Sequence, residues 1–292
     1  MPSFFSRRFS ASSGLSERDR LNALHVLHQT ILEPYHSEVI NTHLYNIHLT
    51  QRRTAVLDVG TGTGEWAIQL ANTHQYSDVL GVDIDWRLMN RDAKSKFGNI
   101  DFAAVDVEEP LPWPRGKFDV IHVKGLLLEI SNYVRLIEKL AMVLRPGGLM
   151  VITEVETSYV SSTDQEIPRS LKQWDACVNA AFGSKGIDVD FPSKIMYSIA
   201  NSGVFASNPY CQQLAVPSYS YTRGDPLTVA RSGQTHPNLL SANFKKILST
   251  LIEYGYNQHE LEGLMQSCLA ELSNPHAGYY QRLIAVYATK VC

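Results

Sequence analysis

Apolar residues between positions 54 and 156 fall into short runs that alternate with amphipathic stretches. The short runs predict five strands, at 54–60, 78–84, 100–107, 118–124 and 149–155. The stretches between them predict helices at 65–74, 87–98 and 133–144. Strands that alternate with helices indicate a parallel sheet with helices on both faces, so the predicted class is α/β.

The flanking regions are more helical. Apolar spacing of three and four residues predicts helix over 17–49, and Pro34 should divide it in two. After residue 156, we expect helices at 165–182, 191–202, 239–254 and 257–272, a weak strand at 208–220 and a final strand at 279–290. The expected organisation is a flexible tail (1–16), a helical cap (17–50), a cofactor-binding core (51–156), and lid helices with the last strands (157–292).

Composition narrows the function classes. The chain has 292 residues, a formal net charge of −3 and 44% hydrophobic residues, as expected of an ordinary globular protein with a large core. No basic field indicates a nucleic-acid partner, and no apolar run is long enough to span a membrane. Four widely separated cysteines are typical of reduced thiols, so we expect a cytoplasmic protein; the Arg- and Ser-containing tail leaves targeting open.

The stretch LDVGTGTGEW at 57–66 carries the clearest chemistry. Glycines at 60, 62 and 64 follow a predicted strand, where the backbone can turn sharply and approach a ligand. The spacing lacks the third glycine of a dinucleotide loop and the lysine of a phosphate-binding P-loop. The turn therefore indicates a different nucleotide-like ligand.

Two acids at the ends of the next strands refine this interpretation. Asp83 ends the second strand, where a carboxylate would accept both hydroxyls of a ribose. Asp106 ends the third strand, where it would face an adenine amino group. The alternative is that both acids only cap the segments that follow them. With the glycine turn, they predict a three-part adenosine site.

The chain resembles the class I S-adenosylmethionine-dependent methyltransferases, and within them a fungal secondary-metabolism group related to a nuclear regulator. The resemblance rests on VLDVGTGTGEWAIQLA, VLGVDI, FAAVDVEEPLPW, FDVIHVK and LRPGGLMVITEVE, and extends weakly over about 40–290. It implies a Rossmann-like doubly wound sheet of seven mostly parallel strands with an antiparallel last strand, and helices forming a lid. Glu65, where this group more often has an aliphatic residue, departs from the pattern.

The resemblance also implies roles for residues of this chain. Gly60, Thr61 and Gly62 should line the methionine end of S-adenosylmethionine, and Asp58 should orient the turn or reach the amino group through water. The adenosine should be held by Asp83, Ile84, Asp106 and Val107. Val123 and Lys124 should close the floor below the sulfonium. Trp86 would lie over the adenosine or cover the sheet edge.

The methyl acceptor is less clearly indicated. We expect a small molecule, with O-methylation favoured over N- or C-methylation; a regulatory protein that keeps the fold, or a repurposed enzyme that retains the cofactor, are the alternatives. Proton removal calls for a base, for which His36, Lys124 and Glu154 are the candidates, with Glu129 as another acid near the same edge. The spacing of His25 and His28 lacks a carboxylate, so no metal is expected.

The acceptor pocket should be covered by 17–50, 157–200 and 218–275. A set of aromatic side chains is expected either to line it or to belong to the core: Tyr35, Tyr45, Trp174, Phe182, Tyr197, Phe205 and Tyr210. The oligomeric state is expected to be monomer or homodimer.

Overall fold

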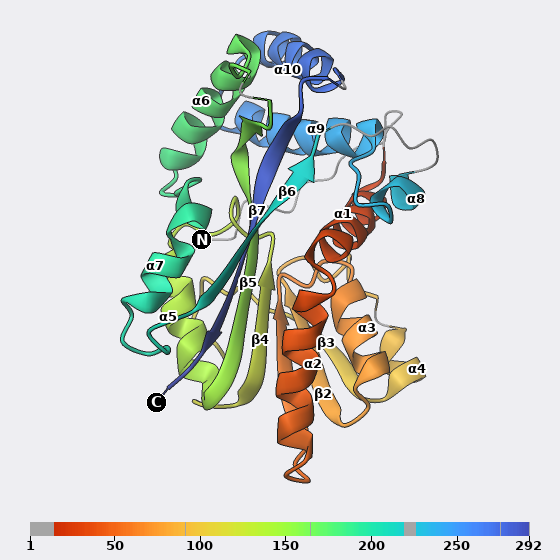
Figure 1. The fold of residues 1–292 in the computed structure, drawn as a ribbon, viewed down its shortest axis with the longest axis vertical. Coiled ribbons are helices and arrows are strands. Elements are labelled where there is room, and N and C mark those ends of the chain that lie inside the picture. Colours follow the sequence, from red (N-terminus) through yellow and green to blue (C-terminus); the bar gives the residue numbers. More distant parts are fainter. Residues whose placement is uncertain (1–14, 91, 164, 219–225, 275, 292) are drawn as a thin grey trace.

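The computed structural model describes residues 15–90, 92–163, 165–218, 226–274 and 276–291. Most of the predicted flexible tail lies outside these ranges. The chain forms one seven-stranded sheet in the order β3-β2-β1-β4-β5-β7-β6 (Figure 1). The strands are β1 (Thr54–Val59), β2 (Ser77–Asp83), β3 (Ile100–Ala104), β4 (Phe118–Lys124), β5 (Leu144–Ser161), β6 (Tyr210–Pro217) and β7 (Tyr279–Thr289).

The strand directions match the predicted topology. β1, β2, β3, β4 and β5 pair in parallel, whereas β7 is antiparallel to both β5 and β6. The predicted Rossmann-like sheet with an antiparallel last strand is therefore confirmed. Within the described ranges, no helix is long and apolar enough to cross a membrane.

Helices cover both faces and one end of the sheet (Figure 1). One face carries α1 (Glu17–Leu32), α2 (Tyr35–His48), α3 (Glu65–Thr73) and the short α4 (Ala93–Phe97). The other carries α5 (Tyr133–Val143), the 3-10 turn η1 (Phe191–Lys194) and α7 (Ile195–Ala200). Beyond the sheet's end lie α6 (Arg169–Gly183), α8 (Pro226–Ala230), α9 (Pro237–Glu253) and α10 (Gln258–Leu272).

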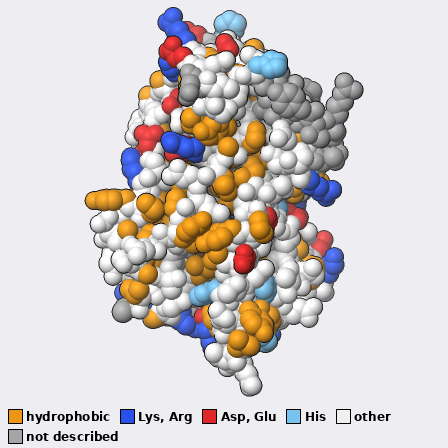
Figure 2. All heavy atoms as spheres, in the orientation of Figure 1, with side chains coloured by type: hydrophobic (Ala, Val, Ile, Leu, Met, Phe, Trp, Pro, Cys, Tyr) orange, Lys and Arg blue, Asp and Glu red, His pale blue; other side chains and the backbone are white. Residues whose placement is uncertain are grey.

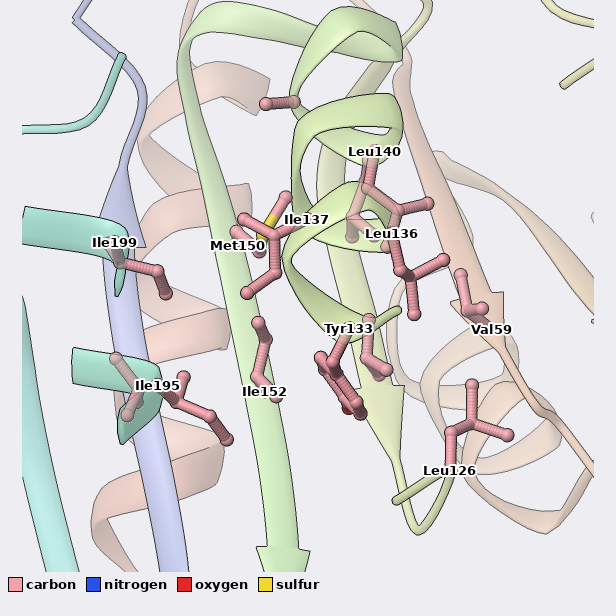
Figure 3. Close-up of a cluster of buried hydrophobic side chains, with 14 of the residues drawn as sticks. Val59, Leu126, Tyr133, Leu136, Ile137, Leu140, Met150, Ile152, Ile195 and Ile199 are labelled. Atoms are coloured by element: carbon pink, nitrogen blue, oxygen red, sulfur yellow. The ribbon is translucent and has the colours of Figure 1, made fainter. Parts of the chain in front are cut away.

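Three apolar clusters stabilise these layers. The close-up in Figure 3 shows side chains of α5 in this cluster, with Ile137 beside Met150 of β5 and Leu136 on the side of Val59. A second cluster packs α1, α2 and α3 against the opposite face, and a third joins α6, α9 and α10. Burial of apolar area at about 25 cal/mol per Å² is the main favourable term for each.

Some predicted elements differ in extent. The helix predicted over 87–98 is reduced to α4, because Asp85 and Asn90 accept backbone bonds of local turns that compete with a helix. The strand predicted over 149–155 is longer, since β5 pairs with β7 far past its parallel partner β4. The predicted division at Pro34 is confirmed.

Figure 2 shows the face seen in Figure 1, with hydrophobic side chains gathered across its middle and most Lys and Arg side chains nearer its rim. Among the described residues, this face carries no continuous basic stripe of the kind that follows a nucleic-acid backbone.

Candidate functional site

The glycine turn joins the carboxyl end of β1 to α3 and is held by its own side chains. Thr61 Oγ1 donates to Asp58 Oδ2 at 2.6 Å, and the Gly62 N–H donates to Asp83 Oδ2 at 2.9 Å. Gly60 has a positive φ of 69°, and a Cβ at this position would lie 2.5 Å from a methyl carbon of Leu126. Only glycine therefore satisfies both the turn and the contact with the loop after β4.

The predicted adenosine residues lie at the ends of neighbouring strands. Asp83 also accepts from the Asp85 N–H at 2.9 Å, and burial raises the pKa of its carboxyl group. Asp106 accepts from the Glu108 N–H at 2.9 Å. Both acids thus accept bonds from the segments that follow them, as the capping alternative expects. Because β2 and β3 are parallel neighbours, their carboxyl ends also lie at the same edge of the sheet.

The other adenosine candidates differ in exposure. Ile84 is 40% exposed and Trp86 is 50% exposed, so both offer apolar surface beside Asp83. Val107 is buried, and its carbonyl oxygen accepts from Lys139 Nζ. These positions provide an apolar border at the open edge of the sheet.

Asp58 also belongs to a buried polar cluster on the face of the sheet that α2 and α3 cover. Its Oδ1 atom lies 2.8 Å from His122 Nδ1, and the imidazole stacks on Trp66 with ring centroids 3.9 Å apart. Burial lowers the pKa of His122, against the opposing effect of Asp58. The sequence interpretation missed His122, although a histidine inside the otherwise apolar run FDVIHVK was a visible signal.

Two predicted catalytic residues, Lys124 and His36, belong to this buried cluster. Lys124 Nζ lies 3.0 Å from His25 Nδ1, and burial lowers the pKa of Lys124 to about 8. His36 Nδ1 lies 3.0 Å from Tyr287 Oη, and burial lowers its pKa to about 2. Alternate residues of β4 point to opposite faces, so Lys124 projects toward α1 while Val123 projects toward α5.

Helix α1 closes over the glycine turn. Thr63 Oγ1 donates to Asn22 Oδ1 at 2.7 Å, and a Cβ on Gly62 would lie 3.5 Å from Leu21. Arg20 links this helix to α9 through a 3.0 Å bond to Asn243 Oδ1. Sequence analysis placed 17–50 above the site but did not single out these contacts, because each joins segments far apart in the chain.

A cavity of about 230 Å³ lies beside the turn, between α1, α9 and the carboxyl end of β5. Its wall also includes the loop 125–129 and the end of β6. Apolar side chains such as Leu24 and Ile247 share the wall with polar ones. Of the predicted aromatic set, Phe182 lines the cavity; Trp174 and Phe205 are buried in the core, and Tyr45 and Tyr197 are exposed.

Glu154 lines this cavity, but its oxygens are already engaged. Oε1 accepts from the Leu126 N–H at 2.8 Å and from Tyr133 Oη at 2.5 Å, and Oε2 accepts from the Leu127 N–H at 3.2 Å. Burial raises its pKa to about 7, whereas these bonds lower it. Of the three candidate bases, Glu154 is thus the one that the structure brings to the cavity; His36 and Lys124 are not among its lining residues.

No group of three or more His, Cys, Asp or Glu side chains in the described part of the chain is arranged to hold a metal ion. His25 contacts Lys124, and His28 lies on the cavity wall.

Known proteins that match this chain in sequence are described as methyltransferases or as a regulator of secondary metabolism. Residues 50–203, just over half of the chain, match a family described as "Methyltransferase domain". The chain is 25% identical to "Secondary metabolism regulator laeA" of Coprinopsis cinerea over 90% of its length and 66% of that protein. It is 30% identical to "Methyltransferase pytC" of Aspergillus terreus over 52% of its length and 43% of that protein. The chain thus spans less than two thirds of these curated relatives.

One solved structure supports the fold. A phosphoethanolamine N-methyltransferase from Haemonchus contortus, solved with S-adenosylhomocysteine, aligns with a TM-score of 0.51 and 16% identity over 82% of this chain and 49% of that one. These matches confirm the expected resemblance to class I methyltransferases of the fungal secondary-metabolism group. The family match bears out the expected methyltransferase domain.

Proposed function

Because the chain belongs to the methyltransferase domain family, we propose that it transfers a methyl group from S-adenosylmethionine to an oxygen atom of a small molecule. The observation that carries the proposal is the contact between the two halves of the site. Four residues of the loop 125–129 line the cavity, and a fifth residue of that loop, Leu126, packs against Gly60 of the glycine turn. A bound donor and an acceptor in the cavity would therefore lie next to each other.

The residues of the turn fit the donor. The turn at Thr61 and Gly62 would border the methionine end, and Asp83 places a partly buried carboxylate where the ribose hydroxyls would come. Asp106 and Val107 lie where the adenine edge would come. Ile84 and Trp86 provide apolar surface for the rings. Bound here, S-adenosylmethionine supplies an electrophilic methyl group on a sulfonium.

Methyl transfer depends mainly on how the protein positions the donor and the acceptor. Methyl transfer to a nucleophile is an in-line displacement, and holding both reactants in one geometry accounts for much of the acceleration. The cavity volume of about 230 Å³ is below the roughly 300–1,000 Å³ of pockets that bind drug-sized ligands. We infer that a small acceptor, or one end of a larger one, enters it. Apolar side chains such as Leu24 and Phe182 would exclude water around the reacting atoms.

Calorimetry with S-adenosylmethionine and S-adenosylhomocysteine tests the donor site. We expect micromolar binding of both and a loss of about 10- to 150-fold in affinity for Asp83→Asn, because hydrogen bonds to a charged group contribute about 1.5–3 kcal/mol. The matched control is Asp78→Asn on the same strand, whose side chain is 63% exposed and paired with Arg53. No binding by the unaltered protein would overturn the proposal.

A second candidate is a regulatory methyltransferase that acts on proteins. The observation that favours it is the similarity to the Coprinopsis regulator over 90% of this chain. Incubation of the protein with tritiated S-adenosylmethionine and a fungal extract separates the two. Label in the solvent-extractable fraction supports a small-molecule acceptor, and label in the protein fraction supports the second candidate. A cytoplasmic location and a monomeric or homodimeric state remain predictions.

A further inference from the structure

The cavity wall carries three glutamates, and their surroundings differ. Glu154 is fully engaged by two backbone N–H groups and by Tyr133. Glu156 is bound by Arg282 Nε at 2.6 Å. Glu129 is exposed to the cavity, and no hydrogen bond or salt bridge to its carboxyl group is found within the described ranges. Glu129 is thus the glutamate of this wall whose carboxyl is free to meet an acceptor.

The loop that carries Glu129 is held firmly. The Glu129 N–H donates to the Leu126 carbonyl at 2.9 Å, which closes a tight turn. Glu154 binds the N–H groups of Leu126 and Leu127 from below, and Leu126 presses on Gly60. The position of Glu129 is therefore tied to the cofactor turn on one side and to the cavity on the other.

The groups around Glu129 come from four elements. Three acids face it: Asp83 at the end of β2, Glu17 of α1 and Glu154 of β5. Lys246 of α9 and Arg20 of α1 are the cations. Desolvation of the carboxyl group at the cavity wall, followed by the charge of Asp83, raises the pKa of Glu129 to about 7 despite the two cations. An acid with this pKa is poised to take up a proton near neutral pH. His28 on the same wall is a poorer acceptor because burial lowers its pKa to about 3.

We propose that Glu129 is the general base that removes the proton from the acceptor hydroxyl, which rests on the methyl transfer proposed above. In the step, the acceptor O–H bond breaks and its proton moves to the Glu129 carboxylate. The oxygen forms the new bond to the methyl carbon. The electron pair of the S–CH₃ bond stays on sulfur, which leaves as a neutral thioether. Glu154 acts as a positioning residue that holds the loop.

The test compares two acceptors that differ in their need for a base. Phenol enters as a neutral hydroxyl, whereas 4-nitrophenol, a much stronger acid, is largely ionised at mildly alkaline pH, where the comparison is made. Transfer of tritiated methyl from S-adenosylmethionine is measured for the unaltered protein, Glu129→Gln and Glu129→Asp. We expect Glu129→Gln to lose at least about 100-fold in kcat/KM with phenol and far less with 4-nitrophenol. Glu129→Asp should restore part of the loss.

The pH profile gives an independent readout. For the unaltered protein, kcat/KM with phenol should rise as the pH passes through about 7, since the base works in its deprotonated form. That limb should disappear in Glu129→Gln. The matched control is Glu138→Gln on the exposed face of α5, which should keep both the rate and the profile.

Calorimetry with S-adenosylmethionine distinguishes failure of the Glu129 proposal from failure of the proposed methyl transfer. Glu129→Gln should bind it within about fivefold of the unaltered protein, since the Glu129 carboxyl group makes no hydrogen bond to the residues of the glycine turn. Loss of binding in that variant alone would make Glu129 a cofactor ligand and overturn the proposal. Equal losses with both phenols, or no transfer to either by a protein that binds the donor, would overturn it as well. A protein that binds no donor contradicts the proposed function itself.

Discussion

The cofactor turn and the acceptor cavity meet at residues 125–129, and they are assembled in opposite ways. The turn and its two acids come from one continuous segment, 58–107, in which each residue follows a strand by a short connection. The cavity takes its wall from α1, β5, β6 and α9, which lie far apart in the sequence. The first depends on backbone geometry, the second on tertiary packing. Their responses to substitution should differ accordingly.

The largest expected effect is on the free energy of unfolding, for a buried residue of the helices that surround the cavity. Phe244 of α9 is 3% exposed and packs on Trp174 with ring centroids 4.8 Å apart. Phe244→Ala should reduce the free energy of unfolding by about 3–5 kcal/mol. Donor binding below the unfolding transition should change only a few-fold. Denaturant titration and calorimetry measure the two quantities.

Phe244→Leu is the matched control, with an expected cost of about 1.5 kcal/mol or less because most of the volume is kept. An alanine variant that loses donor affinity as strongly as it loses stability would contradict the separation between the two halves.

A smaller effect on stability, with a larger one on binding, is expected at the turn. Gly60→Ala combines a positive φ, which costs about 1–2 kcal/mol, with the collision against Leu126. We expect donor affinity to fall by about 10-fold or more, which corresponds to about 1.4 kcal/mol, because the turn or the Leu126 side chain must move to relieve the collision.

Gly98→Ala separates the two contributions. Gly98 has a similar φ of 73°, but no atom lies within 4 Å of a Cβ built there. This variant should lose a similar backbone term and keep donor affinity. Equal donor affinities in the two variants would show that the contact with Leu126 does not matter.

The smallest effect is expected at the far end of β4, away from both halves. Asp119 is buried and accepts from Arg52 and Arg145 at 2.8 Å each. Burial raises the pKa of Asp119, but the hydrogen bond from Arg52 and the nearby charges dominate and hold it below its usual value. The depressed pKa stabilises the fold above pH of about 4, and the contribution is lost as the pH falls through the folded pKa.

Because the two arginine side chains are 42% and 37% exposed, solvent screening limits this contribution to about 1 kcal/mol. The stability difference between the unaltered protein and Asp119→Asn should be constant at neutral pH and shrink in acid. Denaturant unfolding at several pH values measures it. A difference that grows in acid would reverse the assigned sign, and donor binding should not change in either case.

The contrast between the halves also explains what the sequence could predict. β4 occupies the predicted range, and Asp58, Asp83 and Asp106 lie at strand ends as expected, because short apolar runs and glycines are local signals. The direction of side chains on β4 was not predictable. Its residues are buried on both faces, so FDVIHVK shows no alternation that would place Lys124 toward α1.

The cavity was harder to predict for a different reason. Its lining residues are brought together by packing between segments far apart in the sequence. The apolar periodicity of one helix does not indicate which other segment that helix contacts. α9 was predicted as amphipathic, but nothing in its sequence indicates that Asn243 meets Arg20. Among the candidate bases, the sequence did not distinguish the engaged Glu154 from the free Glu129. Only their hydrogen-bond partners do.

Leu126 has a consequence for the order of events during turnover. Its side chain rests on Gly60, and its backbone N–H is held by the same glutamate that anchors the loop on the cavity wall. A ligand that shifts the turn must therefore displace the loop, and the reverse is equally true. By linkage, the factor by which donor tightens acceptor binding equals the factor by which acceptor tightens donor binding. Under the proposed function, the affinity of the donor site would therefore depend on whether the cavity is filled, and the contact between Leu126 and Gly60 would carry that dependence.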